Sequence, residues 1–130
     1  MTALLDTNVL VRHLTGDPPD LAARATAYLS TAEALILPDL ILAEVVYVLE
    51  SFYEVPRSQV AESARSIVTF GSIRTADPGL LLRAVEVYEV HRIDFSDAYL
   101  VALAETAGVD DIASFDRTID RVSTVTRIEP

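Results

Sequence analysis

The sequence contains no cysteine, no lysine and no tryptophan. Without cysteine there is no disulfide framework, no thiolate zinc site and no cysteine nucleophile, and a reducing compartment is permitted. The only imidazoles, His13 and His91, lie far apart in the sequence among arginines and apolar residues. We interpret them as ordinary surface or helix histidines and not as metal ligands. Zinc is therefore disfavoured as a bound metal.

Positive charge is also scarce. Twenty acids face ten bases, all of them arginine, and the formal net charge is −10. Broad, sequence-independent binding of nucleic acid normally needs a basic face, and this composition provides no such electrostatic footprint. The same charge suits association with a basic partner.

Long apolar runs are absent. Asp6 and Arg12 interrupt the first apolar run, and no stretch approaches the ~18 uninterrupted apolar residues of a membrane span. We therefore expect no targeting or membrane segment and a soluble, cytoplasmic protein. The chain has 130 residues, of which 51 % are hydrophobic, and shows no repeat or linker. This predicts a single domain over residues 1–130 with one core.

Short apolar runs alternate with longer segments of helical spacing. We expect strands at 2–5, 34–37, 72–74, 111–115 and 124–128, and helices at 9–14, 21–29, 39–52, 60–68, 79–90 and 98–107. Gly16 and Gly108 are helix stops, and Asp20 is a candidate cap for the second helix. The alternation predicts an α/β fold in which helices cover both faces of a mostly parallel sheet.

Four acids stand at the ends of strands or within apolar helices. Asp6 and Asp116 follow predicted strands, Asp97 lies in the first turn of a helix, and Glu44 lies in the apolar helix 39–52. Functional groups gather beyond the carboxyl ends of strands in open α/β sheets. Converging carboxylates are costly to desolvate without a cation, and an all-oxygen ligand set suits Mg²⁺ or Mn²⁺.

Each acid also has an interpretation that needs no chemistry. Asp6 and Asp116 are good helix N-caps, and Asp94 with Asp97 has a spacing close to a capping box. Glu44 could form a narrow polar stripe with Tyr47 and Ser51, although an acid in the middle of a helix is not a cap.

Taken together, the segments 4–12, 43–45, 94–98 and 114–116 resemble a PIN domain, and specifically a VapC-type toxin of a toxin–antitoxin pair. The resemblance implies a three-layer α/β/α fold with a central, mostly parallel sheet and a Mg²⁺- or Mn²⁺-dependent endoribonuclease. It implies homodimers and a cognate antitoxin whose tail occludes the active site.

The resemblance also assigns residues. Its catalytic and metal-binding acids correspond to Asp6, Glu44, Asp97 and Asp116, and it places Asn8 and Ser114 beside the metal. We expect Asp6, Asp97 and Asp116 to be the principal ligands and Glu44 to bind through water or take a proton. We assign Asp94 to capping or to support of the site, although acids are frequent at this position in the family. Arg12 and Arg117 are candidates for contacts with RNA, because arginine is the only fixed cation in the chain.

Two alternatives remain open at this point. The segment Asp6–Val9 after a strand is similar to the nucleophile loop of haloacid dehalogenase-like phosphotransfer enzymes, but those usually have a second aspartate where Asn8 stands and a lysine beside the phosphoryl group. The other alternative is a catalytically silent module that uses the same fold for protein contacts.

Overall fold

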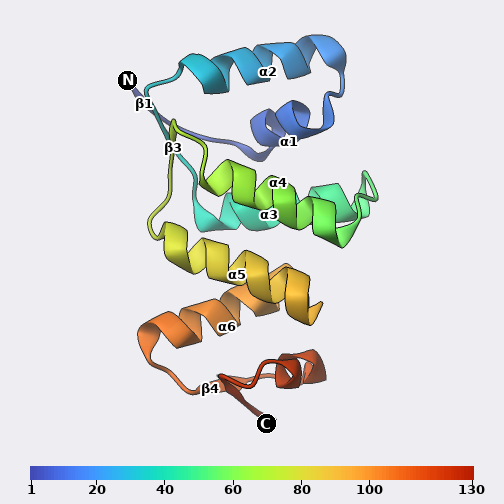
Figure 1. Ribbon diagram of the computed structural model, residues 1–130, viewed down its shortest axis with the longest axis vertical. Coiled ribbons are helices and arrows are strands. Elements are labelled where there is room, and N and C mark those ends of the chain that lie inside the picture. Colours follow the sequence, from blue (N-terminus) through green and yellow to red (C-terminus); the bar gives the residue numbers. More distant parts are fainter. The chain divides into compact units, whose positions relative to one another are not determined.

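Strands alternate with pairs of helices over most of the chain in the computed structural model, which describes residues 1–130 (Figure 1). The chain divides into two compact units, Met1–Pro78 and Gly79–Pro130. Every strand pairing is parallel. The α/β class with parallel sheets and helices is therefore confirmed, and the single domain over residues 1–130 stays a prediction.

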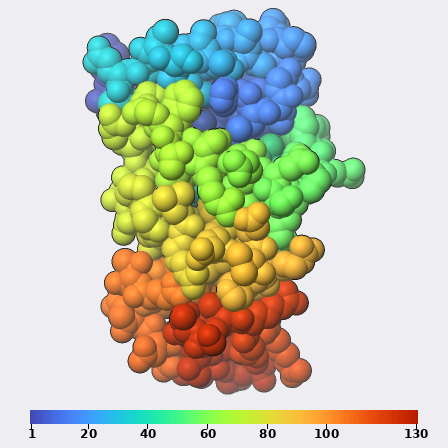
Figure 2. All heavy atoms as spheres, viewed as in Figure 1, coloured from blue at the N-terminus to red at the C-terminus, as the bar shows by residue number.

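The first unit is built on a three-stranded parallel sheet in the order β1-β2-β3. The strands are β1 (Thr2–Leu4), β2 (Ala34–Ile36) and β3 (Ile73–Arg74). Parallel neighbours need a crossover, and helices supply it. These helices are α1 (Thr7–Thr15), α2 (Pro19–Thr31), α3 (Asp39–Ser51) and α4 (Arg57–Val68). α1 and α2 pack against one another, and their atoms form the blue part of Figure 2.

The second unit contains a two-stranded parallel sheet. Its elements are α5 (Pro78–His91), α6 (Phe95–Ala107), β4 (Asp111–Ala113), the 3₁₀ helix η1 (Arg117–Arg121) and β5 (Thr126–Ile128). β4 pairs with β5, and η1 lies in the connection between them. The sequence did not predict this 3₁₀ helix.

Helix ends follow the expected chemistry in part. Gly16 and Gly108 adopt left-handed φ angles of 71° and 70° and end α1 and α6, as predicted. The predicted cap of α2 is wrong, because Pro18 occupies the N-cap position and Asp20 lies in the first turn. An acid there still interacts favourably with the helix dipole.

Apolar side chains fill the interior of each unit. Leu10, Leu35 and Leu42 are fully buried in the first unit, and Leu81 and Tyr88 are fully buried in the second. No helix combines the length and the apolar character that crossing a bilayer requires.

Candidate active site

Three carboxylates meet in the second unit. Asp94, Asp97 and Asp116 each offer one oxygen, and these oxygens lie within 4.8 Å of one another. Asp94 and Asp97 are three residues apart at the start of α6, a spacing that puts side chains on one face of a helix. Asp116 stands at the N-cap of η1, an element in contact with α6. We call these three residues the acidic triad.

The triad contains two acids with opposite pKa shifts. Burial, followed by the hydrogen bond and charge of Asp116 and the charge of Asp94, raises the pKa of Asp97 to about 6. The hydroxyl and then the backbone N–H of Thr118 lower the pKa of Asp116. Without a cation, Asp97 therefore holds a proton far more readily than its neighbour does.

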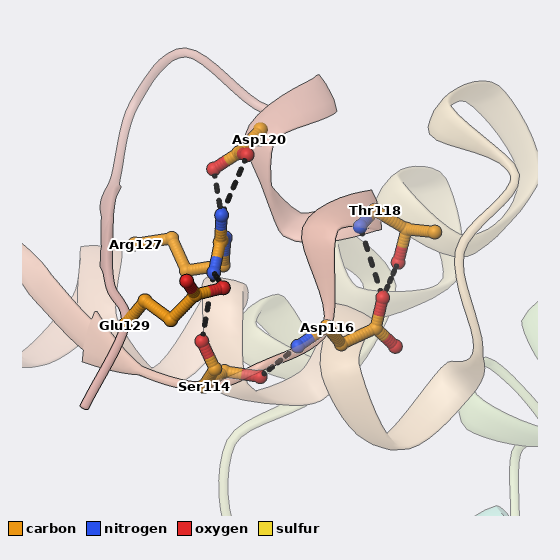
Figure 3. Close-up of polar contacts among 6 residues, drawn as sticks. All are labelled: Ser114, Asp116, Thr118, Asp120, Arg127 and Glu129. Carbon is orange, nitrogen blue, oxygen red and sulfur yellow. Dashed lines mark hydrogen bonds and ion pairs between the residues drawn. The ribbon is translucent and has the colours of Figure 1, made fainter.

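Thr118 fixes the direction of the Asp116 carboxylate (Figure 3). Its backbone N and its Oγ1 both donate to Oδ1 of Asp116, at 2.9 and 2.7 Å. The backbone N of Asp116 donates to Oγ of Ser114 at 2.9 Å. Because both bonds from Thr118 fall on Oδ1, Oδ2 is not committed to them and can serve a metal.

A second group of contacts holds the loop before Asp116 (Figure 3). Arg127, on β5, donates from Nη1 to the carbonyl of Ser114 at 3.0 Å. The same guanidinium makes two bonds to Asp120, at 3.1 and 3.2 Å, and one to Glu129 at 3.1 Å. Its side chain is only 11 % exposed. The position of Ser114, and through it that of Asp116, is thus supported from the neighbouring strand.

The remaining predicted acids lie in the first unit, around one open cavity of about 330 Å³. Asp6 and Asn8 reach it from the start of α1, and Glu44 reaches it from α3. Oδ1 of Asp6 accepts from the backbone N of Thr7 at 2.8 Å. The other lining residues are Thr7, Val11, Arg12, Val48, Phe52 and Tyr53.

A buried hydroxyl beside Asp6 lacks a hydrogen-bond partner. Thr7 is only 7 % exposed, and its Oγ1 makes no hydrogen bond. An unsatisfied buried hydroxyl costs roughly 1–3 kcal/mol. One such group thus lies directly beside a predicted site residue, and another, Oγ1 of Thr75, lies elsewhere in the unit.

Comparison with known proteins identifies the family. A family model described as PIN domain matches residues 3–125. The chain belongs to the PIN domain family. PIN domains are typically metal-dependent nucleases, so the acidic triad of this PIN domain is in keeping with its family.

Searches of curated proteins and of solved structures do not add to the family assignment. No curated protein matches the chain. Among solved structures, the chain is similar to VapC20 of Mycobacterium tuberculosis, described as a toxin that cleaves the sarcin–ricin loop. The identity is 18 %, all of both chains is covered, and the TM-score is 0.45.

The structure of this PIN domain thus brings the predicted residues together in two groups. Asp97 and Asp116 meet within the second unit, and Asp6, Asn8 and Glu44 line one cavity in the first. The convergence of all four acids on one ion stays a prediction. Arg12 lines the cavity, whereas Arg117 is exposed at the start of η1.

The alternatives in which the acids only cap helices or form a polar stripe are confirmed for some residues and not for others. Asp6 and Asp116 do cap α1 and η1 with their side chains. Asp94 occupies the N-cap position of α6 but makes no side-chain cap bond, so the capping-box alternative fails there. Glu44 is exposed, as a polar stripe on α3 predicts, and it nevertheless lines the cavity with Asp6.

Sequence reasoning missed four residues that support the site. Thr118 stands two residues after Asp116, the spacing at which an aspartate accepts from a following backbone N–H, and this signal was available. Nothing in the sequence marked Arg127, because its contacts come from a parallel pairing with β4. Phe52 and Tyr53 follow an apolar helix, and aromatic residues at such a position are usually interpreted as part of the hydrophobic core.

The residues of the triad fit a hard divalent cation. Three carboxylates without a histidine or cysteine ligand match the oxygen ligands of Mg²⁺ and Mn²⁺. Burial and then the neighbouring acids raise the pKa of Asp97, and a bound cation would lower it. We infer from this chemistry that Asp97 and Asp116 can hold a metal, with Asp94 close enough to assist.

Proposed function

We propose that this PIN domain is a Mg²⁺- or Mn²⁺-dependent endoribonuclease and the toxin of a toxin–antitoxin pair. The acidic triad carries the proposal, because it gathers Asp97 and Asp116 with a third carboxylate inside a chain that matches the PIN family over residues 3–125. The cation would supply Lewis acidity and charge neutralisation for phosphodiester hydrolysis.

The chain's own residues have distinct tasks in this proposal. Asp97 and Asp116 bind the cation, and Thr118 keeps Asp116 ionised, as the lowered pKa of Asp116 supports. Asp6 is the third principal ligand, and its backbone contact with Thr7 orients its carboxylate. Glu44 holds a water molecule or accepts a proton from it, a role that its exposed position on α3 allows. Asn8 and Ser114 support the site.

The proposed protein partner is an antitoxin encoded beside this chain. A net charge of −10 favours a basic segment as the antitoxin's contact with this protein. We also propose a homodimer, by resemblance to VapC-type toxins. Co-expression with the neighbouring gene should relieve growth arrest caused by this chain alone, and arrest that the neighbour leaves unchanged would remove the toxin–antitoxin part of the proposal.

The nuclease part is tested with purified protein and single-stranded RNA. We expect cleavage with Mg²⁺ or Mn²⁺, none in EDTA, and a loss of at least 100-fold in rate for Asp97→Asn or Asp6→Asn. Asp110→Asn and Asp20→Asn are matched controls, because both acids are exposed and lie outside the triad and the cavity. Cleavage in EDTA, or full activity in both site variants, would overturn the carboxylate mechanism.

Metal affinity separates the roles of the acids. Calorimetric titration with Mn²⁺ should show weak or no binding to Asp97→Asn, because this variant lacks a direct ligand. Glu44→Gln should bind Mn²⁺ nearly as tightly as the unaltered protein and still lose about 100-fold in cleavage rate. Equal loss of Mn²⁺ affinity in both variants would make Glu44 a direct ligand instead.

A further inference from the structure

The cavity in the first unit has an aromatic side as well as an acidic one. Phe52 and Tyr53 line it at the end of α3, with ring centroids 5.0 Å apart and ring planes inclined at 67°. Phe52 is 74 % exposed. A ring so exposed adds little to the core of the unit, and it is accessible to a ligand that enters the cavity.

Tyr53 is fixed in a way that supports Phe52. Its hydroxyl donates to Oδ2 of Asp17 at 3.1 Å, and its side chain is half-buried. The edge-to-face contact between the two rings then favours one orientation for Phe52. The result is an exposed ring that rests on an anchored one.

The cavity also contains a cation that no carboxylate neutralises. Arg12 lines it, and its Nη1 makes one long bond of 3.4 Å to the carbonyl of Asp17. Arg83 and Arg127, in contrast, form ion pairs with acids. With twenty acids and ten bases in the chain, an arginine without such a pair is available to an anion that comes from outside.

We propose that this cavity binds one unpaired nucleotide of an RNA strand, with its base stacked on Phe52 and a phosphate contacting Arg12. The inference rests on the proposed nuclease function and adds to it the position that holds an unpaired base. Stacking on aromatic rings is how proteins commonly bind unpaired bases, and it needs a free ring face. The other wall carries Asp6 and Glu44, which places the nucleotide beside two predicted site residues.

The chemistry of the cavity favours RNA over a protein tail. The occupant must bring a flat face to Phe52 and a negative charge to Arg12. A nucleotide has both, whereas a basic peptide would pair with Asp6 and Glu44 and leave Arg12 without a partner. The aromatic ring and the arginine therefore both favour a nucleotide as the ligand.

The test measures RNA affinity in Glu44→Gln protein with Mg²⁺, so that the RNA is bound and cut only slowly during the measurement. Fluorescein-labelled ten-nucleotide strands of A, C, G and U are titrated by anisotropy. Phe52→Leu should raise Kd about tenfold, and Phe52→Trp should restore it. Tyr47→Leu is the matched control and should change nothing, because Tyr47 is 67 % exposed on the same helix but does not line the cavity.

Two further measurements define the contact. Arg12→Gln should weaken binding and lower the salt dependence by about one phosphate contact. Strands of the same length without bases should bind Phe52→Leu and the parent protein equally well, because no base remains to stack.

The outcomes separate this inference from the nuclease proposal. RNA binding that Phe52→Leu leaves unchanged overturns the stacking site while cleavage by the unaltered protein still supports the nuclease. Loss of a neighbouring antitoxin's affinity with unchanged RNA affinity would assign the surface to that protein and overturn the inference. Absence of RNA binding and of cleavage in every variant overturns both, and RNA binding through Phe52 without any cleavage overturns the nuclease alone.

Discussion

Replacing Asp97 by asparagine should stabilise the metal-free protein at neutral pH, although it removes the proposed metal ligand. Three acids meet in the triad, and the pKa of Asp97 is raised to about 6 from an ordinary value of 3.8. The folded state therefore binds the Asp97 proton more tightly than the unfolded state does. Ionisation of this one group opposes folding.

The sign of the pH dependence follows from this difference. The favourable contribution of protonated Asp97 is complete below pH 3.8 and is lost as the pH rises to and beyond about 6. The difference between the two pKa values corresponds to roughly 3 kcal/mol at most. Asp97 is only half-buried, so solvent screening reduces the expected effect to about 1 kcal/mol.

The assay is urea unfolding in EDTA between pH 4.5 and 7.5, on the unaltered protein, Asp97→Asn and the control Asp110→Asn. Only the difference between proteins is used, because groups away from the triad titrate alike in all three. We expect Asp97→Asn to gain about 1 kcal/mol relative to the unaltered protein across this range, and Asp110→Asn to gain little. Added Mn²⁺ should reverse the order, since it stabilises only proteins that bind it.

The reasoning would be refuted if Asp97→Asn and the unaltered protein showed parallel stability curves over this pH range. Parallel curves would mean that neither burial nor the neighbouring carboxylates disfavour the ionised form of Asp97 in solution. The triad would then be more open than described, and its case as a metal centre would weaken.

Three further outcomes follow from particular contacts. Thr118→Val removes the hydroxyl that donates to Asp116, so the pKa of Asp116 should rise and Mn²⁺ affinity, measured by calorimetry, should fall about tenfold. Arg127→Gln should lower both Mn²⁺ affinity and Tm, because the loop before Asp116 loses its support from β5. Leu42→Ala in the core should lower the free energy of unfolding by about 3 kcal/mol in urea, whereas Leu40→Ala, at a side chain 77 % exposed, should change it by less than about 0.5 kcal/mol.

Each outcome has a contrary result. Unchanged Mn²⁺ affinity in Thr118→Val would show that the backbone N–H alone orients the carboxylate. Normal Tm and normal Mn²⁺ affinity in Arg127→Gln would show that the ion pairs of Arg127 contribute neither to stability nor to the site. Equal effects of the two leucine variants would contradict the burial that distinguishes them.

The periodic elements were predictable because burial imposes their spacing on the sequence. The helix expected at 39–52 is observed as Asp39–Ser51, and the strand expected at 72–74 is observed as Ile73–Arg74. The 3₁₀ helix η1 was not predictable in this way. Its first turn is organised by the bonds from Thr118 to Asp116, and such side-chain contacts leave no periodic pattern.

The acids of the site were predictable by type and position, but their environments were not. The argument from costly burial applies to Asp97, for which burial is the largest cause of the raised pKa. It does not apply to Asp6 and Glu44, which are exposed. Asp94 was assigned to capping or support, and only its lack of a cap bond shows that its carboxylate is available to the triad.

Capping and metal binding were weighed as alternatives for Asp6 and Asp116, and the geometry shows why they are compatible. A carboxylate has two oxygens, and in both residues the cap bonds fall on Oδ1. A bond to one oxygen restricts the rotation of the whole group and so directs the other oxygen before any cation arrives. An aspartate that caps a helix at the end of a strand is thus already oriented as a ligand, and the capping signal in the sequence counts neither for nor against a site.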